Sequence, residues 1–375
     1  MTAPSTAPVD WATAAQIARR VGRPGPVASR AELDDLVGGL RTAAHDAVGH
    51  VLRVTRMRPA GDDVDLEHHP DGRLRRVRAP RPDLGDVRVV DRATWALANT
   101  RSMAAMTGPA FAALTPDARP GGSGAARLAG AAEVGGLLAL LSTKVLGQFD
   151  PYGEGRPVLL LVAPNVLAAE RALRLDPADF RLWVCLHEQT HALQFAAAPW
   201  LAEHLAGRLG ELLQDVTTTS LDLARAPWRD KAALVGRTVL DAVRGDLTTP
   251  LDPVLGPEQK RVLAEITAVM ALLEGHADVM MDAVGPRVVR SVRTIRARFE
   301  KRRDGEGAPR LDVVLRRVLG MDAKLAQYRD GAAFVRAVEK EVGRAGLNAV
   351  WAAPGNLPGP REIHDPRAWV RRVHG

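Results

Sequence analysis

Two histidines and a glutamate stand close together in residues 182–195, which read LWVCLHEQTHALQF. Within this segment His187, Glu188 and His191 form the pattern H-E-x-x-H. In a helix, four residues turn the chain through about 400°, so the two histidines share one face, one turn apart. Both imidazoles can then reach one small cation. Glu188 follows the first histidine and can point at a water molecule on the open side of that cation.

A catalytic zinc ion suits this arrangement. Zn²⁺ takes histidine nitrogens at roughly 2 Å in a tetrahedral shell and leaves one position for water. It lowers the pKa of that water towards ~7, and a neighbouring carboxylate can take the proton. We therefore expect Zn²⁺ on His187 and His191, with Glu188 activating the zinc-bound water. Iron and other first-row metals also suit such ligands, and two satisfied core histidines beside a surface glutamate are the alternative without a metal.

A third metal ligand is expected from residues 264–284, a second apolar stretch with charged residues inside it. Glu274 and Asp278 are four residues apart and share a helix face. We expect Glu274 to be the third ligand and Asp278 to accept the free N–H of a ligand histidine, which would fix its tautomer and orientation. His276, on roughly the opposite face, is the alternative third ligand. A partly exposed helix with ordinary surface charges would explain the same residues without a site.

A hydrolase also needs a donor for the oxyanion of its transition state. Tyr152 and Tyr328 are the only two tyrosines in the chain, and His276 is a third candidate donor. The residues do not favour one of the three. The motif does not extend to H-E-x-x-H-x-x-G-x-x-H, because Gln194 stands at the glycine position and Ala197 at the third histidine position. This excludes the metzincin pattern.

The elements that must position these residues read as mostly helical. Asp176 and Pro177 are typical of a helix start, so we expect the motif helix to begin there. Residues 125–147, rich in glycine and alanine, are expected to form a helix that packs closely against the motif helix. Residues 157–162 are expected to form a strand. It either borders the cleft and pairs with an extended substrate or is fully buried, since periodicity cannot separate the two.

Residues 182–201 resemble the zincin-like metallopeptidase family that is labelled "coenzyme F420 biosynthesis-associated". The resemblance covers about residues 9–373. Other segments that resemble the family are VVDR at 89–92 with Trp95 and Asn99, VLGQFDP at 145–151, LLVAPN at 160–165, EGHA at 274–277, DAK at 322–324, QYR at 327–329, LP at 357–358, EI at 362–363 and Trp369.

This resemblance implies a predominantly helical α+β fold of the zincin-like type, with an H-E-x-x-H active-site helix and a small sheet. We expect one such domain over residues 1–375. Within it we expect a helical N-terminal part at 1–120, a zinc-binding core at 125–290, and C-terminal helices with an extended tail at 310–375.

The resemblance also implies an activity and a set of site residues. His187, Glu188 and His191 carry over to the family's motif, and Glu274 carries over by analogy with zincins whose ligand glutamate is followed four residues later by an aspartate. The implied activity is that of a zinc-dependent hydrolase, most simply a metallopeptidase that cleaves a peptide or a small amide.

A catalytically weak or inactive zincin-fold protein that binds or scaffolds a partner, associated with F420 metabolism, is the alternative function. An intact Glu188 argues against it, because a purely structural zinc site needs no base there. The coenzyme label reflects genomic association, and nothing in these residues indicates a deazaflavin site.

Composition and charge exclude several other classes of protein. The 375 residues carry a formal net charge of +7, but no basic stripe with interleaved aromatic residues is present, so nucleic-acid binding is not expected. The most apolar long run, residues 125–146, is broken by charges, whereas a membrane span needs ~20 nearly uncharged residues. The single cysteine, Cys185, and an N-terminus unlike a signal peptide favour a cytoplasmic location. The residues do not indicate protein partners.

Overall fold

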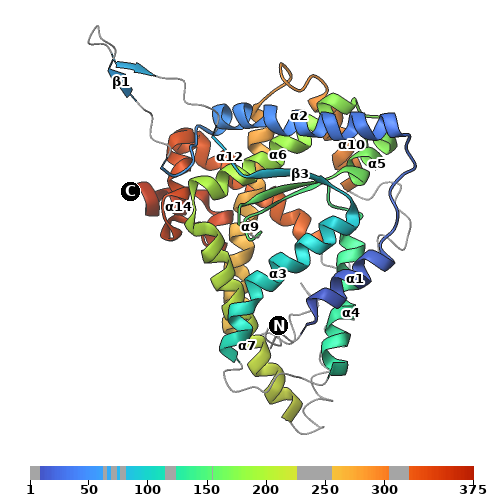
Figure 1. Cartoon of the computed structure of the whole chain (residues 1–375). Helices are drawn as coiled ribbons and strands as arrows, with labels where there is room; N and C mark the ends of the chain where they lie inside the picture. Colours follow the sequence, from blue (N-terminus) through green and yellow to red (C-terminus); the bar gives the residue numbers. More distant parts are fainter. Residues whose placement is uncertain are drawn as a thin grey trace.

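A computed structural model of the chain describes residues 9–61, 66–68, 74–76, 82–114, 124–153, 155–225, 256–303 and 321–375. Helices make up most of the described chain, and a small three-stranded sheet lies among them (Figure 1). This confirms the predicted, predominantly helical α+β class. In the described part of the chain, no helix combines the length and the apolarity that crossing a membrane requires.

Helix α6 (Pro177–Ala197) carries the H-E-x-x-H pattern. It begins where the sequence predicts: the Asp176 carboxylate accepts a hydrogen bond from the Asp179 N–H at 2.9 Å, and Pro177 occupies the first turn. Most of its side chains are buried, and they are distributed over several faces. A helix buried in this way has neighbours nearly all round it. Polar groups at that depth are costly unless they are bonded or bind a ligand.

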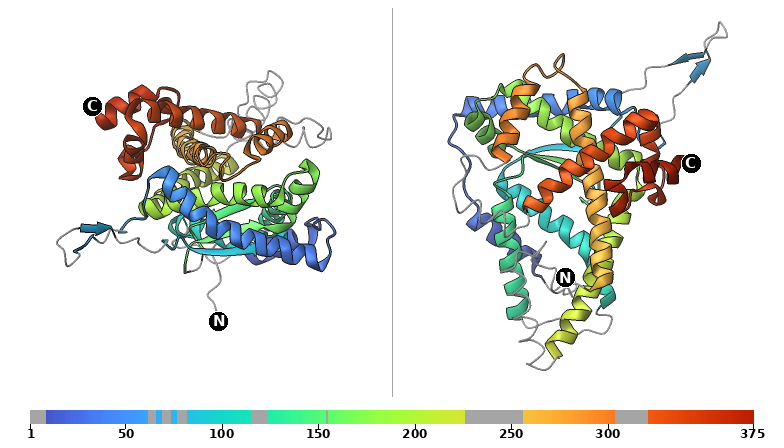
Figure 2. Two further views of the ribbon diagram at one scale, coloured as in Figure 1. Left: turned by 90° about the horizontal axis from the view of Figure 1, so that it is seen from above. Right: turned by 180° about the vertical axis from the view of Figure 1, so that it is seen from behind.

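Helix α2 (Arg30–Thr55) lies along α6 and covers one side of it (Figure 2). The single cysteine of the chain, Cys185, faces this partner. Its Sγ lies 3.8 Å from the Leu40 carbonyl oxygen. The side chain is completely buried, and burial raises the pKa of its thiol. Cys185 is therefore an inert core residue sealed between two helices.

Strand β5 (Val158–Val162) is the central strand of the sheet, with β3 (Asp86–Val90) parallel on one side and β4 (Gly147–Asp150) antiparallel on the other. All five of its side chains are buried. Leu159 and Leu161 join the main core with α2 and α6, and the other three join a second apolar core on the opposite face. Of the two predicted alternatives, the fully buried strand is thus the one observed. The edge strand nearest α6 is β4.

Helices α1 (Trp11–Val21), α3 (Arg92–Leu114) and α4 (Gly124–Leu141) pack together and supply the second core. A Cβ on Gly135 of α4 would lie 2.6 Å from the Ala14 carbonyl oxygen of α1, so these two helices approach backbone to backbone. The prediction that the small-residue helix packs against the motif helix is wrong. Gly135 serves the contact with α1 instead.

Helices α7 (Trp200–Arg225) and α9 (Pro257–Ala283) both contact α6 and run side by side (Figure 1). Helix α12 (Met321–Leu347) packs against α9. A Cβ on Gly275 of α9 would lie 2.1 Å from the Gly331 carbonyl carbon of α12. Only glycine at this crossing lets the two backbones come so close, and the crossing fixes how α9 is rotated.

The C-terminal residues, predicted to be extended, form short helical turns. Three prolines, Pro354, Pro360 and Pro366, each occupy the first turn of one of these elements, where proline needs no hydrogen-bond partner for its nitrogen. The prolines therefore start helices rather than prevent them. The remaining described elements are β1 (Leu66–His68), β2 (Leu74–Arg76), α5 (Ala163–Leu173), α10 (Val292–Arg303), η1 (Asn348–Trp351), η2 (Pro354–Asn356), α13 (Pro360–His364) and α14 (Pro366–His374).

Candidate metal centre

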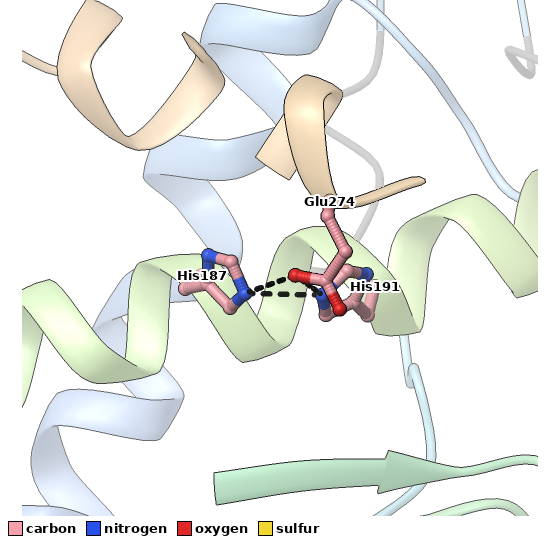
Figure 3. Close-up of side chains that lie close together, drawn as sticks. All are labelled: His187, His191 and Glu274. Carbon is pink, nitrogen blue, oxygen red and sulfur yellow. Dashed lines mark hydrogen bonds and ion pairs between the residues drawn. The ribbon is translucent and has the colours of Figure 1, made fainter. Parts of the chain in front are cut away.

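The side chains of His187, His191 and Glu274 converge on one point (Figure 3). The two histidines come from successive turns of α6, and Glu274 reaches them from α9. His187 Nε2 lies 3.1 Å from His191 Nε2. Glu274 Oε2 lies 3.3 Å from the His187 nitrogen and 3.6 Å from the His191 nitrogen. Helix packing thus brings together the three residues predicted as ligands.

These separations fit the ligand shell of a small tetrahedral cation. Ligand atoms at the 2.0–2.1 Å typical of zinc lie about 3.3–3.4 Å apart along a tetrahedral edge. The observed values of 3.1, 3.3 and 3.6 Å bracket that spacing. Among the described residues, this is the one group of at least three histidine, cysteine or carboxylate side chains close enough to hold a metal ion. Two imidazoles with one carboxylate form a donor set that catalytic zinc sites use.

Gln194 fixes the tautomer of His191. Its amide nitrogen donates to the Leu273 carbonyl oxygen at 3.0 Å, and a carbonyl oxygen can only accept. The amide oxygen must therefore face His191 Nδ1, 2.8 Å away, and accept its N–H. The lone pair of His191 Nε2 is therefore free to bind a cation at the point where the three side chains converge. Sequence reasoning missed this role, although the spacing of three residues places both side chains on one helix face.

His276, predicted as an alternative ligand or oxyanion donor, lies behind Gln194 and does not line the cavity. Its ring is fully buried, and its Nδ1 accepts from the Gln194 amide nitrogen at 3.0 Å. The ring also packs edge-on against Trp351, with ring centroids 5.2 Å apart. Burial lowers the pKa of His276 to about 3, so the ring is neutral. The structure therefore corrects both predicted roles, because this face of α9 points into the core.

Asp278 lines the cavity, but among the described residues its bonded partner is an arginine and not a ligand histidine. Arg296 of α10 donates to Asp278 Oδ1 at 2.6 Å and to Asp282 Oδ1 at 2.6 Å. The group bonded to His191 Nδ1 is Gln194. The role predicted for Asp278 is corrected accordingly. Its spacing puts it one turn beyond Glu274 on the same face, where Arg296 pairs with it.

Glu188 lies against the edge strand β4. The Phe149 N–H favours the charged form of its carboxylate, although burial outweighs this effect on the pKa. A Cβ on Gly147 would lie 2.6 Å from Glu188 Cγ and 2.8 Å from Cδ, so only glycine leaves room for the carboxylate there. Glu188 is 7% exposed, and burial raises the pKa of its carboxyl group. A raised pKa moves a carboxyl towards the range in which it can both accept and release a proton near neutral pH.

The site favours positive charge at the point where its side chains meet. Burial disfavours the charged form of His191, but the Glu274 and Glu188 carboxylates outweigh burial and raise the pKa to about 9. Burial also opposes ionisation of Glu274, yet His191 and His187 hold the pKa of this carboxyl well below its usual range. A proton or a metal cation is stabilised at the same place.

His187, Glu188, His191 and Glu274 all line one cavity of about 640 Å³. Tyr152 also lines it, but its hydroxyl donates to the Ala202 carbonyl oxygen at 2.9 Å, and burial raises the pKa of this hydroxyl to about 12. The side chain of Tyr328 lies outside the described residues. Of the predicted oxyanion donors that the structure describes, Tyr152 is the one at the cavity wall.

Comparisons with known proteins agree with this geometry. A family model described as "Zincin-like metallopeptidase" matches residues 9–370. The chain is also similar to the crystal structure of a candidate hydrolase with a novel fold from Chloroflexus aurantiacus. The two share 28% sequence identity with a TM-score of 0.62, over 97% of this chain and 98% of that chain. The comparison with curated proteins found no match.

Proposed function

The chain belongs to the zincin-like metallopeptidase family, and from this premise we propose that it is a zinc-dependent hydrolase, a metallopeptidase that cleaves a peptide or a small amide. His187, His191 and Glu274 would hold the zinc, and Glu188 would be the general base. The observation that carries the proposal is the set of ligand-atom separations, 3.1, 3.3 and 3.6 Å, inside a cavity that Glu188 also lines. The similar Chloroflexus protein, itself a candidate hydrolase, supports the broader class.

A zinc ion held by His187, His191 and Glu274 would polarise the substrate carbonyl and lower the pKa of the attacking water. Glu188, which lies against Gly147 of β4, would take a proton from the water as it attacks the carbonyl carbon. Glu188 then delivers that proton to the leaving amine nitrogen, so the amide bond breaks without a free amide anion. Gln194 keeps His191 Nδ1 protonated and so keeps Nε2 available to the cation.

The metal content of purified protein, measured by mass spectrometry, tests the ligand set. We expect about one zinc per chain in the wild type, as one tetrahedral site requires, and loss of zinc in His187→Ala and Glu274→Ala. His204→Ala on α7 and Glu265→Ala on α9 are matched controls outside the centre and should keep the metal. If zinc is lost in His187→Ala but kept in Glu274→Ala, the third ligand is a residue other than Glu274. A folded wild type that takes up no metal, even from added zinc, would overturn the proposal.

Amide hydrolysis tests the chemistry. A library of capped peptides is incubated with the zinc-loaded protein, and products are identified by mass spectrometry. Glu188→Gln should keep its zinc and lose about 100-fold or more in rate, the contribution of a general base. Zinc-loaded wild type that cleaves nothing would favour the binding or scaffold protein instead. Neither comparison refers to coenzyme F420, so the association with its metabolism stays a prediction.

A further inference from the structure

From the walls of the cavity we infer that the enzyme selects substrates with a bulky apolar side chain beside the cleaved amide, on the His191 side of the metal centre. The inference rests on the proposed function, because it names the substrate class of that same site. The wall that receives this side chain, called the apolar subsite, is formed by Phe149, Phe195, Leu205, Leu209, Ile266 and Met270.

Helix register puts this wall on the His191 side. Phe195 follows His191 by four residues on α6, so it lies one turn further along the same face. On α9, Met270 precedes Glu274 by four residues and Ile266 precedes it by eight, so they lie one and two turns earlier on the ligand's face. The metal centre and the apolar subsite are therefore successive turns of the same two helices.

Two other elements close the apolar subsite. Leu205 and Leu209, four residues apart, line the cavity from α7. Phe149 lines it from the edge strand β4, with its ring centroid 5.5 Å from that of Phe195. All six members of the apolar subsite are only partly buried. They thus leave apolar surface uncovered next to the reacting atoms, and a substrate side chain can cover it.

The His187 side of the cavity has a different character. Trp183, four residues before His187, and Met281 are almost completely buried, at 6% and 2% exposure, so they offer little surface to cover. The partly buried Phe299 also lines the cavity here, with its ring edge-on to Trp183. Asp278 brings a charge to this side and binds Arg296, whose guanidinium carbon lies 5.7 Å from the Trp183 ring centroid. The two sides differ, and the apolar side chain of the substrate belongs on the His191 side.

Small hydroxamates test the preference without relying on catalysis, because their head group binds zinc while the side chain is varied. The probes are acetohydroxamate and its analogues with isobutyl, benzyl and carboxyethyl groups, measured by calorimetry on the zinc-loaded chain. Each buried methylene raises affinity roughly fourfold. We expect the isobutyl and benzyl probes to bind at least about tenfold more tightly than acetohydroxamate. The carboxyethyl probe should gain nothing in the apolar subsite, because none of its six side chains can donate a hydrogen bond to the carboxylate that loses water there. Equal affinities for all four would overturn the inference.

Substitutions in the apolar subsite test whether these residues bind the apolar group of the probe. Met270→Glu and the milder Ile266→Ser should abolish or reduce the gain from apolar groups, while the affinity for acetohydroxamate stays within about threefold. Leu137→Glu places the same charge on an exposed leucine of α4 and should leave the preference intact. If Met270→Glu fails to fold, Ile266→Ser carries the test. If the folded variants still prefer the apolar probes as strongly as the wild type does, the subsite does not lie on the His191 side at these residues.

The outcomes separate this inference from the proposed function. If the isobutyl and benzyl probes bind more tightly than acetohydroxamate but no amide is cleaved, the hydrolase proposal fails and the apolar subsite is still supported. If acetohydroxamate does not bind, the metal proposal fails. The same comparison is then made with N-acetylphenylalaninamide and N-acetylglycinamide by saturation-transfer NMR, which needs no metal. Absence of a preference for the phenylalanine amide would overturn the inference in that case too.

Discussion

At the scale of single residues, one buried amide decides which nitrogen His191 can offer. Gln194 is fully buried, and its three hydrogen bonds, to His191, His276 and the Leu273 carbonyl, allow only one orientation of the amide. Polar networks of this kind are specific because each bond determines the next. The geometry of the candidate metal centre therefore extends beyond the three ligands into the core.

Gln194→Leu should weaken zinc binding by about 10- to 100-fold, the usual effect of removing the partner of a ligand histidine. The reason is that Nδ1 of His191 loses its acceptor and the ring loses its fixed orientation. Competition with a chromophoric chelator measures the affinity. The matched control is Gln189→Leu, which removes a buried amide on the same helix that bonds to the Ala44 carbonyl of α2. Equal zinc affinity in Gln194→Leu and wild type would refute this role.

Spacing along one helix made most residues of the candidate metal centre predictable. His187, Glu188 and His191 depend only on the 3.6-residue period, and Glu274 depends on a carboxylate inside an apolar helix. The roles of His276 and Asp278 were assigned wrongly because they depend on how α9 is rotated. That rotation is set by contacts with distant parts of the chain, such as Trp351, which packs against His276.

At the scale of elements, the edge strand β4 positions Glu188, the proposed general base. Gly147→Ala should lower kcat by about 100-fold, the effect of moving a catalytic group by roughly 1 Å. The added methyl group would collide with Glu188 Cγ and displace its carboxylate, while the ligands stay in place. Steady-state kinetics and zinc content are measured together. Gly136→Ala, whose Cβ would meet nothing within 4 Å, is the control. A Gly147→Ala enzyme with normal kcat would contradict the steric argument.

A buried ion pair holds the start of the motif helix. Arg181 of α6 donates to Glu170 of α5 at 2.9 Å, and their side chains are 8% and 5% exposed. Glu170→Ala should destabilise the fold by about 3 kcal/mol, because it removes the buried partner and leaves the guanidinium paired only with Asp35, which lies at the same 2.9 Å but is exposed. Urea unfolding measures the change. Asp34→Ala breaks an exposed pair with Arg30 and should have little effect. Similar losses in both variants would show that burial of the pair does not matter.

The strands were harder to predict than the helices. Residues 158–162 read as an apolar run, and such a run has no period that tells a central strand from an edge strand. The edge strand nearest α6, β4, has only four residues, which is too short for an alternating pattern to stand out. The packing of α4 against α1 was likewise unpredictable, because glycines indicate a close contact without naming the partner.

At the scale of the whole molecule, a bound metal would bridge α6 and α9, two helices that are separated in sequence. Zinc that binds only the folded chain should stabilise it by about 4 kcal/mol when its free concentration is 1,000 times the Kd. Removal of the metal with EDTA should therefore lower the melting temperature in scanning calorimetry. His187→Ala should melt at the same temperature with and without EDTA. A wild type that loses its zinc without any change in melting temperature would show that the metal does not stabilise this pairing.

The buried thiol of Cys185 can report on how often the motif helix becomes exposed to solvent. It is two residues from His187 and closed off by α2, so a thiol reagent such as DTNB can react only while the motif helix is displaced from its neighbour. The labelling rate of the native chain, divided by that of the unfolded chain, is then the equilibrium constant for exposing this helix. With a single cysteine in the chain, every modified molecule reports on that one event. Rates measured with and without zinc would distinguish local opening of the motif helix from cooperative unfolding of the whole chain.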